Sequence, residues 1–129
     1  MGGLIVKKNK ILICQRSSDN EHPLKWEFPG GKVKKKEKPQ QALKRELNEE
    51  LKITIEHPTY LCDYMFEYQD LGKKVNLFFF LINEYSGEIS NTVHNQLKWI
   101  EIKQLSDYDF LEGDHDIIKK ILKNDLKIN

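Results

Sequence analysis

The chain has 129 residues, with 39% hydrophobic, 10% aromatic and 32% charged side chains, and this length and composition predict one globular domain over residues 1–129. The 21 Lys and Arg residues nearly balance the 20 Asp and Glu residues, which leaves a formal net charge of +1. So small a net charge excludes long-range attraction to a nucleic-acid polymer or a membrane, and a polyanionic ligand captured locally, of nucleotide size, is favoured instead.

The cysteines and the apolar segments predict the cellular compartment. Cys14 and Cys62 show no metal-ligand spacing and are expected to be free thiols in a reducing environment. The first ten residues lack the features of a signal peptide, and no apolar run reaches membrane length. We therefore expect a cytoplasmic protein, either a monomer or a homodimer.

The chain begins with a predicted β-hairpin. Residues 3–7 and 10–15 form short apolar strands, and Lys8-Asn9 is the tight turn between them. After a polar loop, residues 26–28 are expected to be extended, because Pro29 disfavours a helical conformation at the residue before it.

A single amphipathic helix follows, from Pro39 in its first turn to Leu51. One side of it carries leucines at four-residue spacing, which can dock on a core: Leu43, Leu47 and Leu51. A neighbouring side is acidic because its carboxylates stand at positions i, i+3 and i+4: Glu46, Glu49 and Glu50. Such a side is either a solvated surface, which a partner protein can use for docking, or a ligand site.

Two details favour a ligand site. Arg45 precedes the acidic set and Glu37 lies in the loop before the helix, so one ion pair can tie the loop to the helix. The Gly30-Gly31 pair lets the backbone approach a ligand closely and offer a carbonyl oxygen. Hard oxygen donors of this kind suit Mg²⁺ or Mn²⁺, especially when a polyphosphate supplies further oxygens.

The rest of the chain predicts more strands and a last helix. A strand is expected to begin at 53–55 and to resume at 60–68 after His57-Pro58, followed by a turn at 69–73, strands at 75–82 and 96–102, and a helix at 114–122. Asp114 is a candidate N-cap. Strands on both sides of one central helix, with a terminal helix, predict an α/β fold of the α/β/α sandwich type around a mixed sheet.

Residues 30–53, GGKVKKKEKPQQALKRELNEELKI, resemble the Nudix box, G-x5-E-x7-R-E-U-x-E-E-x-G-U with U aliphatic. The positions in register are Gly31, Glu37, Arg45, Glu46, Leu47, Glu49, Glu50 and Ile53. Lys52 replaces the second glycine of the pattern. The preceding WEFPGGK, residues 26–32, is similar to the segment before the box in the MutT branch of (d)NTP pyrophosphohydrolases.

The resemblance implies a Nudix-type sandwich with a strongly bent mixed sheet and a catalytic loop-helix. It also implies Mg²⁺-dependent hydrolysis, with Mn²⁺ possible, of a nucleoside triphosphate to monophosphate and pyrophosphate. Implied metal ligands are the carboxylates of Glu46, Glu49 and Glu50 and the carbonyl of Gly31, with Glu46 or Glu49 as the base. In this family Glu37 and Arg45 hold the loop against the helix.

The resemblance assigns substrate contacts to three residues, and each has a plainer interpretation. Arg16 is either a nucleotide contact or a surface arginine, and Phe28 either lines a base pocket or belongs to the core. Asp114 either reads the base or caps the last helix. Because a carboxylate only accepts hydrogen bonds, it would select the two adjacent N–H donors of guanine, so an oxidised guanine nucleotide such as 8-oxo-dGTP is the first substrate hypothesis.

Departures from the family pattern keep other functions open. Val93 precedes His94 where relatives often have a glutamate, and the loop lysines are either solvated or form a cationic lip for phosphates: Lys32, Lys34, Lys35, Lys36 and Lys38. The alternatives are a pyrimidine nucleotide (CTP-type) pyrophosphohydrolase, a Nudix-fold binding module with weakened turnover, and an acidic docking helix without Mg²⁺ dependence. Because the three helix glutamates are all present, we favour an active enzyme.

Overall fold

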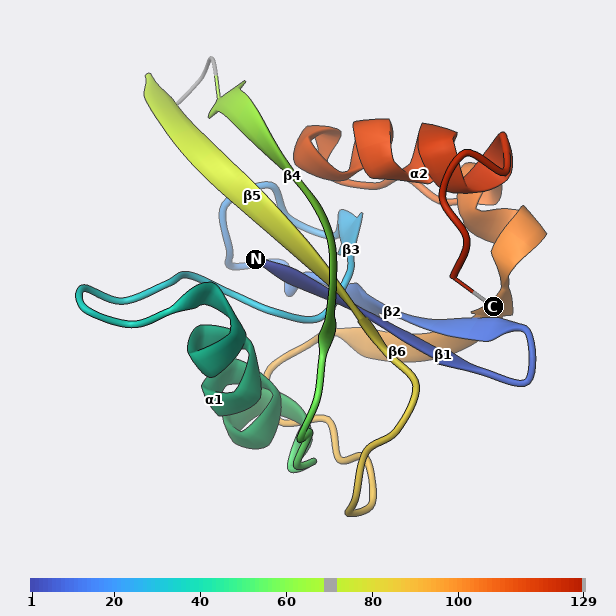
Figure 1. Ribbon diagram of the computed structural model, residues 1–129. Helices are drawn as coiled ribbons and strands as arrows, with labels where there is room; N and C mark the ends of the chain where they lie inside the picture. Colours follow the sequence, from blue (N-terminus) through green and yellow to red (C-terminus); the bar gives the residue numbers. More distant parts are fainter. Residues whose placement is uncertain (69–71, 129) are drawn as a thin grey trace.

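The computed structural model describes residues 1–68 and 72–128, and its helices lie on opposite sides of a sheet (Figure 1). The strands are β1 (Gly2–Lys7), β2 (Lys10–Gln15), β3 (Trp26–Glu27), β4 (Thr59–Tyr68), β5 (Lys73–Ile82) and β6 (Gln96–Glu101). The helices are α1 (Pro39–Leu51) and α2 (His115–Leu122), with short 3-10 helices η1 (Ile102–Asp107) and η2 (Glu112–Asp114). Within these ranges no helix is long and apolar enough to cross a membrane.

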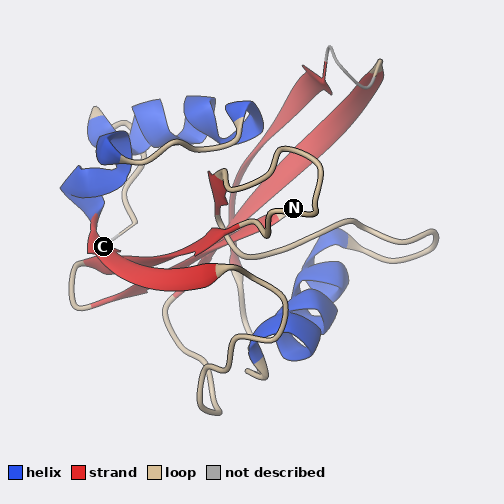
Figure 2. Ribbon diagram, turned by 180° about the vertical axis from the view of Figure 1, so that it is seen from behind, coloured by secondary structure: helices blue, strands red, loops and turns tan. Residues whose placement is uncertain are grey.

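The sheet is mixed, as the sequence predicts. Its order is β3-β2-β1-β5-β4, and β6 pairs with β2. The β1–β5 pair is parallel, whereas β4–β5, β1–β2, β2–β3 and β2–β6 are antiparallel. Because β1 pairs with β2 only near the hairpin turn, at Val6–Ile11 and Lys7–Lys10, the two strands diverge and the sheet bends sharply (Figure 2).

Two hydrophobic cores hold the three layers together. One lies between the sheet and α2 and includes Phe28, Phe79 and Ile117. The other lies between the sheet and α1 and contains the predicted leucine stripe of α1, each leucine fully buried: Leu43, Leu47 and Leu51. Burial of this stripe on one side of α1 turns its acidic side away from the core and toward the loop at residues 30–38. The predicted α/β/α sandwich is therefore confirmed.

Two predicted features of the backbone are also present. Lys8 and Asn9 both have positive φ, 52° and 65°, as the hairpin turn requires. Lys52 ends α1 in the left-handed region, with φ 62° and ψ 30°, and its backbone N–H donates to the last turn of the helix. A lysine at this position therefore adopts the conformation that glycine favours, at a cost of about 1 kcal/mol.

One strand prediction is wrong. Residues 53–55 form no strand and make only an isolated bridge, between Thr54 and Ser86. The apolar pattern there reflects burial of Ile53 and Ile55, which are 0% and 2% exposed, and not strand pairing. Residues 69–71 of the predicted turn at 69–73 lie outside the described residues.

Candidate active site

The loop before α1 is fitted closely to the helix through Gly31. A Cβ atom at this position would lie 2.5 Å from the Cδ atom of Glu46, so only glycine lets that carboxyl group lie directly on the loop backbone. The Gly31 carbonyl accepts a hydrogen bond from the Met1 nitrogen at 2.6 Å. A carbonyl oxygen has a second lone pair, so this bond leaves it able to bind a cation.

Arg45 joins the loop to the helix. Its Nε donates to Glu37 Oε2 at 2.8 Å and its Nη2 to Glu37 Oε1 at 3.0 Å, so the predicted ion pair is present and bidentate. Nη2 also donates to the Lys32 carbonyl at 3.1 Å. The Arg45 hydrogen bonds lower the pKa of Glu37 to about 2. The loop is therefore fixed at its base by a charged clamp.

The same guanidinium also contacts the acidic side of α1. Arg45 Nη1 lies 2.8 Å from a carboxylate oxygen of Glu46 and 3.4 Å from one of Glu49. The Glu49 side chain is 56% exposed. Glu50, in contrast, is largely buried, and burial, followed by the charge of Glu46, raises its pKa to about 8. Repulsion among the carboxylates and attraction to Arg45 together explain why Glu49 turns outward.

The structure therefore brings two of the three predicted carboxylate ligands together, Glu46 and Glu50. Among the described residues, no three His, Cys, Asp or Glu side chains are arranged as a ready-made metal centre. The donor chemistry nevertheless fits a divalent cation: within the same part of the chain, the buried Glu50 Oε2 has no hydrogen-bond partner, and the predicted ligand atoms are all oxygens. A hard cation beside Glu46 and Glu50 would neutralise the Glu46 charge, which adds to burial in raising the pKa of Glu50.

Asp114 is a further predicted site residue and lies directly before α2. It is 9% exposed and stands at the N-cap position of α2, as predicted, but its side chain makes no capping hydrogen bond. The carboxyl group is buried near the Phe28 backbone instead; burial, followed by the charge of Glu27, raises its pKa to about 8. The ring of Phe28 packs in the core against Phe79 and Phe110 at centroid distances of 6.4 and 5.3 Å.

Glu27 is a candidate site residue that the sequence analysis missed. Its carboxylate lies 3.2 Å from the guanidinium of Arg16, whose Nε donates to the Glu21 carbonyl. Burial raises the pKa of Glu27, and its charge in turn contributes to the raised pKa values of both Glu50 and Asp114. Glu27, paired with Arg16, is therefore a charge that Glu50 and Asp114 share as a neighbour. The signal in the sequence that could have identified Glu27 is a charged residue between two aromatic residues, Trp26 and Phe28.

The loop at 90–95 contributes a second missed residue. Val93 is 53% exposed. The next side chain, His94, is only 6% exposed, and its Nε2 lies 3.9 Å from Glu50 Oε1. Burial lowers the pKa of His94, as does the charge of Arg16 to a lesser extent.

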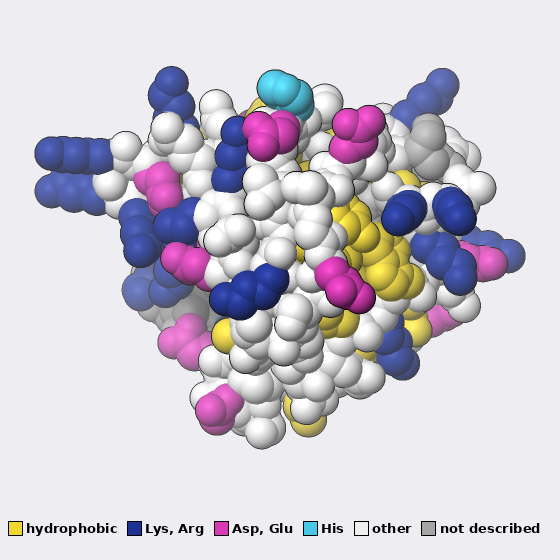
Figure 3. Space-filling view, turned by 90° about the horizontal axis from the view of Figure 1, so that it is seen from below, with side chains coloured by type: hydrophobic (Ala, Val, Ile, Leu, Met, Phe, Trp, Pro, Cys, Tyr) yellow, Lys and Arg dark blue, Asp and Glu magenta, His cyan; other side chains and the backbone are white. Residues whose placement is uncertain are grey.

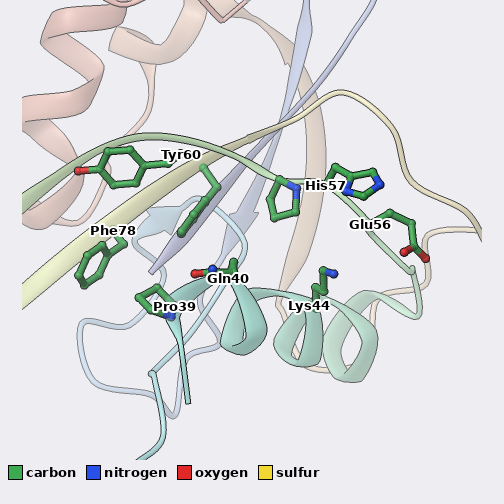
Figure 4. Close-up of a pocket in the computed structure, with 9 residues that line it drawn as sticks. Pro39, Gln40, Lys44, Glu56, His57, Tyr60 and Phe78 are labelled. Atoms are coloured by element: carbon green, nitrogen blue, oxygen red, sulfur yellow. The ribbon is translucent and has the colours of Figure 1, made fainter. Parts of the chain in front are cut away.

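The five loop lysines are all exposed. Figure 3 shows Lys and Arg side chains projecting from the rim of the face seen from below Figure 1, so the solvated interpretation agrees with the structure. A groove of about 500 Å³ lies on the other flank of α1 (Figure 4). It contains none of the predicted site residues and is lined by Pro39, Gln40, Lys44, Glu56, His57, Pro58, Tyr60, Phe78 and Phe80.

Comparisons with known proteins show which family the chain resembles. The NUDIX domain pattern matches residues 2–122. The chain is 36% identical over 121 residues to an 8-oxo-dGTP diphosphatase of Buchnera aphidicola subsp. Schizaphis graminum, covering 94% of this chain and 90% of that protein. It is 28% identical over 122 residues to the CTP pyrophosphohydrolase of Escherichia coli, covering 95% and 89%.

Solved structures agree as well. The crystal structure of a MutT Nudix hydrolase from Burkholderia pseudomallei superposes with a TM-score of 0.83 at 27% identity, covering 93% of this chain and 94% of that one. The family pattern spans nearly the whole chain, and the predicted box lies on the loop and helix that Arg45 joins. The chain therefore belongs to the Nudix family, among its MutT-like hydrolases.

Proposed function

We propose that this Nudix hydrolase cleaves an oxidised guanine nucleoside triphosphate, 8-oxo-dGTP or a close analogue, to the monophosphate and pyrophosphate. The observation that carries the proposal is a pair of acidic ends that share Glu27 as a neighbouring charge: Glu46 lies against Gly31 and beside Glu50, and Asp114 is buried near the Phe28 backbone. The first end suits a cation with a phosphate chain, and the second suits a base that offers N–H donors.

At the phosphate end, the chain's own groups bind and orient. The carboxylates of Glu46 and Glu50 and the carbonyl of Gly31 hold the divalent ion, with Glu49 as a further ligand once it turns from solvent. Mg²⁺ is the proposed ion and Mn²⁺ an accepted substitute; when bound, it neutralises phosphate charge and lowers the pKa of water. Arg45 and Glu37 keep the loop and helix in register, so the donors stay aligned.

The reaction is a hydrolysis of one phosphoanhydride bond. A water oxygen forms a bond to phosphorus, the bridging P–O bond breaks, and the bridging oxygen leaves with the electron pair of that bond. Glu46 or Glu49 accepts the proton that the water loses. Glu46 is supported by its contact with the loop, and Glu49 by its freedom to move; the variants E46Q and E49Q separate the two possibilities.

At the base end, the Asp114 carboxylate accepts from the two adjacent N–H groups of guanine. Phe28 supports this contact mainly through its backbone, because its ring is buried in the core. Arg16, held by Glu27 at 3.2 Å, is proposed to contact the nucleotide.

A pyrimidine triphosphate is the second candidate, and one observation favours it. The similar protein from Escherichia coli named CTP pyrophosphohydrolase aligns with 95% of this chain. In addition, a protonated Asp114 can donate a hydrogen bond as well as accept one, and so can pair with a base edge that offers both a donor and an acceptor.

The test is pyrophosphate release from a panel of oxidised and normal nucleoside triphosphates, with Mg²⁺, with Mn²⁺ and with a chelator. We expect Mg²⁺-dependent release that is fastest with the oxidised guanine nucleotide. Fastest turnover of CTP would favour the second candidate. Binding of nucleotide without release, and without any change in E50Q, would identify a binding module, and no nucleotide or metal response would identify a protein docking helix.

A further inference from the structure

The segment before β6 covers the C-terminal end of α1. The Thr92 hydroxyl donates to the Glu50 carbonyl at 2.8 Å, and the Thr92 backbone N–H approaches the same oxygen at 3.3 Å. The Ser90 N–H donates to the Leu51 carbonyl at 2.9 Å. These bonds satisfy carbonyls that the end of a helix leaves unpaired, and they fix the segment beside the acidic side of α1.

His94 is held in this segment from both sides. The Asn91 side chain accepts from the His94 backbone N–H at 2.9 Å and donates to the His94 carbonyl at 2.8 Å. The next residue, Asn95, donates through its backbone N–H to the Gln15 carbonyl of β2 at 2.9 Å. The backbone on each side of the imidazole is therefore fixed, so the direction of the ring follows from the fold.

The imidazole points at a carboxyl group that the active site uses. His94 Nε2 lies 3.9 Å from Glu50 Oε1. Within the described residues, His94 Nε2 and Glu50 Oε2 are both buried without a hydrogen-bond partner. A buried polar atom without a partner costs free energy, so such atoms are rare outside functional sites. Here two of them belong to side chains that face each other.

We propose that His94 is a positioning residue for Glu50: its Nε2–H donates to Oε1 and thereby directs Oε2 toward the divalent cation. The inference rests on the proposed function, because it assigns a partner to a proposed metal ligand. The approach from 3.9 Å to hydrogen-bonding distance requires only a small side-chain rotation. Partners of this kind fix which oxygen of a metal-binding carboxylate faces the ion.

The geometry also separates His94 from its neighbour. The Val93 side chain is 53% exposed, so a carboxylate at that position would start from an outward direction. The segment before β6 therefore acts on the proposed metal-binding end through the Nε2 atom of His94, which faces Glu50.

The experiment compares H94A, H94Q and the matched control V93A. Binding of Mn²⁺ without nucleotide is measured from the loss of the free-ion electron paramagnetic resonance signal, and kcat and KM are measured with Mg²⁺. We expect H94A to weaken Mn²⁺ binding by about 10- to 100-fold and to lower kcat more than it raises KM. H94Q, whose amide N–H can reach Glu50, should recover most of the affinity, and V93A should match the wild type.

The outcomes distinguish the inference from the function on which it rests. Wild-type affinity in H94A, with a wild-type protein that hydrolyses nucleotide, would overturn the role of His94 and leave the proposed function intact. A wild-type protein that neither binds Mn²⁺ nor releases pyrophosphate would overturn both. If H94A does not fold, the ¹⁵N shift of His94 Nε2 in the wild-type protein decides: it should move on addition of Mg²⁺, and an unchanged shift would overturn the inference.

Discussion

The two ends of the proposed site, one for the metal and one for the base, are built in different ways. The proposed metal-binding end comes from one continuous stretch, Gly31 to Leu51, whose loop and helix are joined by Arg45. The base end is assembled from residues far apart in the chain, Phe28 and Asp114. They meet because Trp26 bridges in parallel to Phe110, and backbone hydrogen bonds link it to Asp109 and Leu111.

This difference indicates which end of the site can change its geometry without a change in the geometry of the other end. A stretch that carries its own clamp keeps its backbone geometry when distant loops change, and only the direction of Glu50 is proposed to depend on such a loop, through His94. A pair of residues joined through a short bridge changes with the loop that carries it. We therefore expect mutations at the metal-binding end to affect the rate of the chemical step, and mutations at the base end to affect substrate choice.

The largest effect is expected for E50Q. This substitution removes a carboxylate that the bound cation requires, so kcat/KM should fall by about 10³-fold with every triphosphate. Because burial raises the pKa of Glu50 to about 8, a neutral amide should leave the metal-free fold at least as stable at neutral pH. Thermal unfolding and a pyrophosphate assay measure the two effects.

The control for E50Q is E56Q, an acidic position on the groove at the other flank of α1. It should keep the wild-type rate. Equal losses in both variants would show that the rate depends on overall charge and not on the carboxylate at position 50.

A smaller loss is expected for E37Q, which weakens the clamp without removing a proposed ligand. Misalignment of the loop should lower kcat by about 10- to 100-fold and speed tryptic cleavage at the loop lysines. The pKa of Glu37 is lowered from 4.5 to about 2, so its ionised form stabilises the fold above pH 4.5 and this contribution is lost as the pH falls through about 2. Unfolding of wild type and E37Q should therefore converge in strong acid, and an unchanged cleavage rate would contradict the clamp.

At the base end, D114N should change substrate choice more than rate. An amide can accept only one of the two guanine N–H groups without opposing the other, so KM for the oxidised guanine nucleotide should rise about 10-fold while kcat changes little. In the wild type this KM should fall as the pH rises through about 8, where Asp114 ionises. A pH-independent KM in the wild type would argue against recognition by this carboxylate.

The same variant has an effect on stability with a defined sign. Because the folded-state pKa of Asp114, about 8, lies above its ordinary value of 3.8, the folded protein holds this proton more tightly than the unfolded chain. Its contribution to the free energy of unfolding therefore falls as the pH rises from 3.8 to about 8. In D114N this dependence should be absent, so the variant should gain stability relative to the wild type toward pH 8.

The smallest effect is expected for K52G at the end of α1. Glycine adopts the left-handed conformation, φ 62° in the structure, without the steric cost that lysine carries, so the free energy of unfolding should rise by about 1 kcal/mol. Activity should stay within about twofold of the wild type, since no ligand changes. A large gain in rate would indicate that Lys52 restricts the active site.

The two ends also differ in how much of their structure could be predicted from the sequence. The loop, α1 and its clamp follow from spacing within one segment, and the family and fold are confirmed. The inward turn of Asp114 depends on how the segment before α2 meets β3, which no local pattern reveals. His94 was missed for a similar reason, because its approach to Glu50 depends on a loop that covers α1.

Several predictions concern properties that the fold does not address. The roles of individual site residues, the single-domain organisation over residues 1–129, the oligomeric state and the cytoplasmic location stay predictions. The first is addressed by the variants above and the third by the solution mass of the protein.

Arg45 affects the properties of the metal-free protein. Its guanidinium already contacts Glu37, Glu46 and Glu49, so part of the acidic side of α1 has a counter-ion of its own. Exhaustive dialysis against a chelating agent should therefore yield a folded but inactive protein, which regains activity when the divalent ion is added back. A built-in counter-charge of this kind suits a catalyst that must remain intact while its cofactor supply fluctuates.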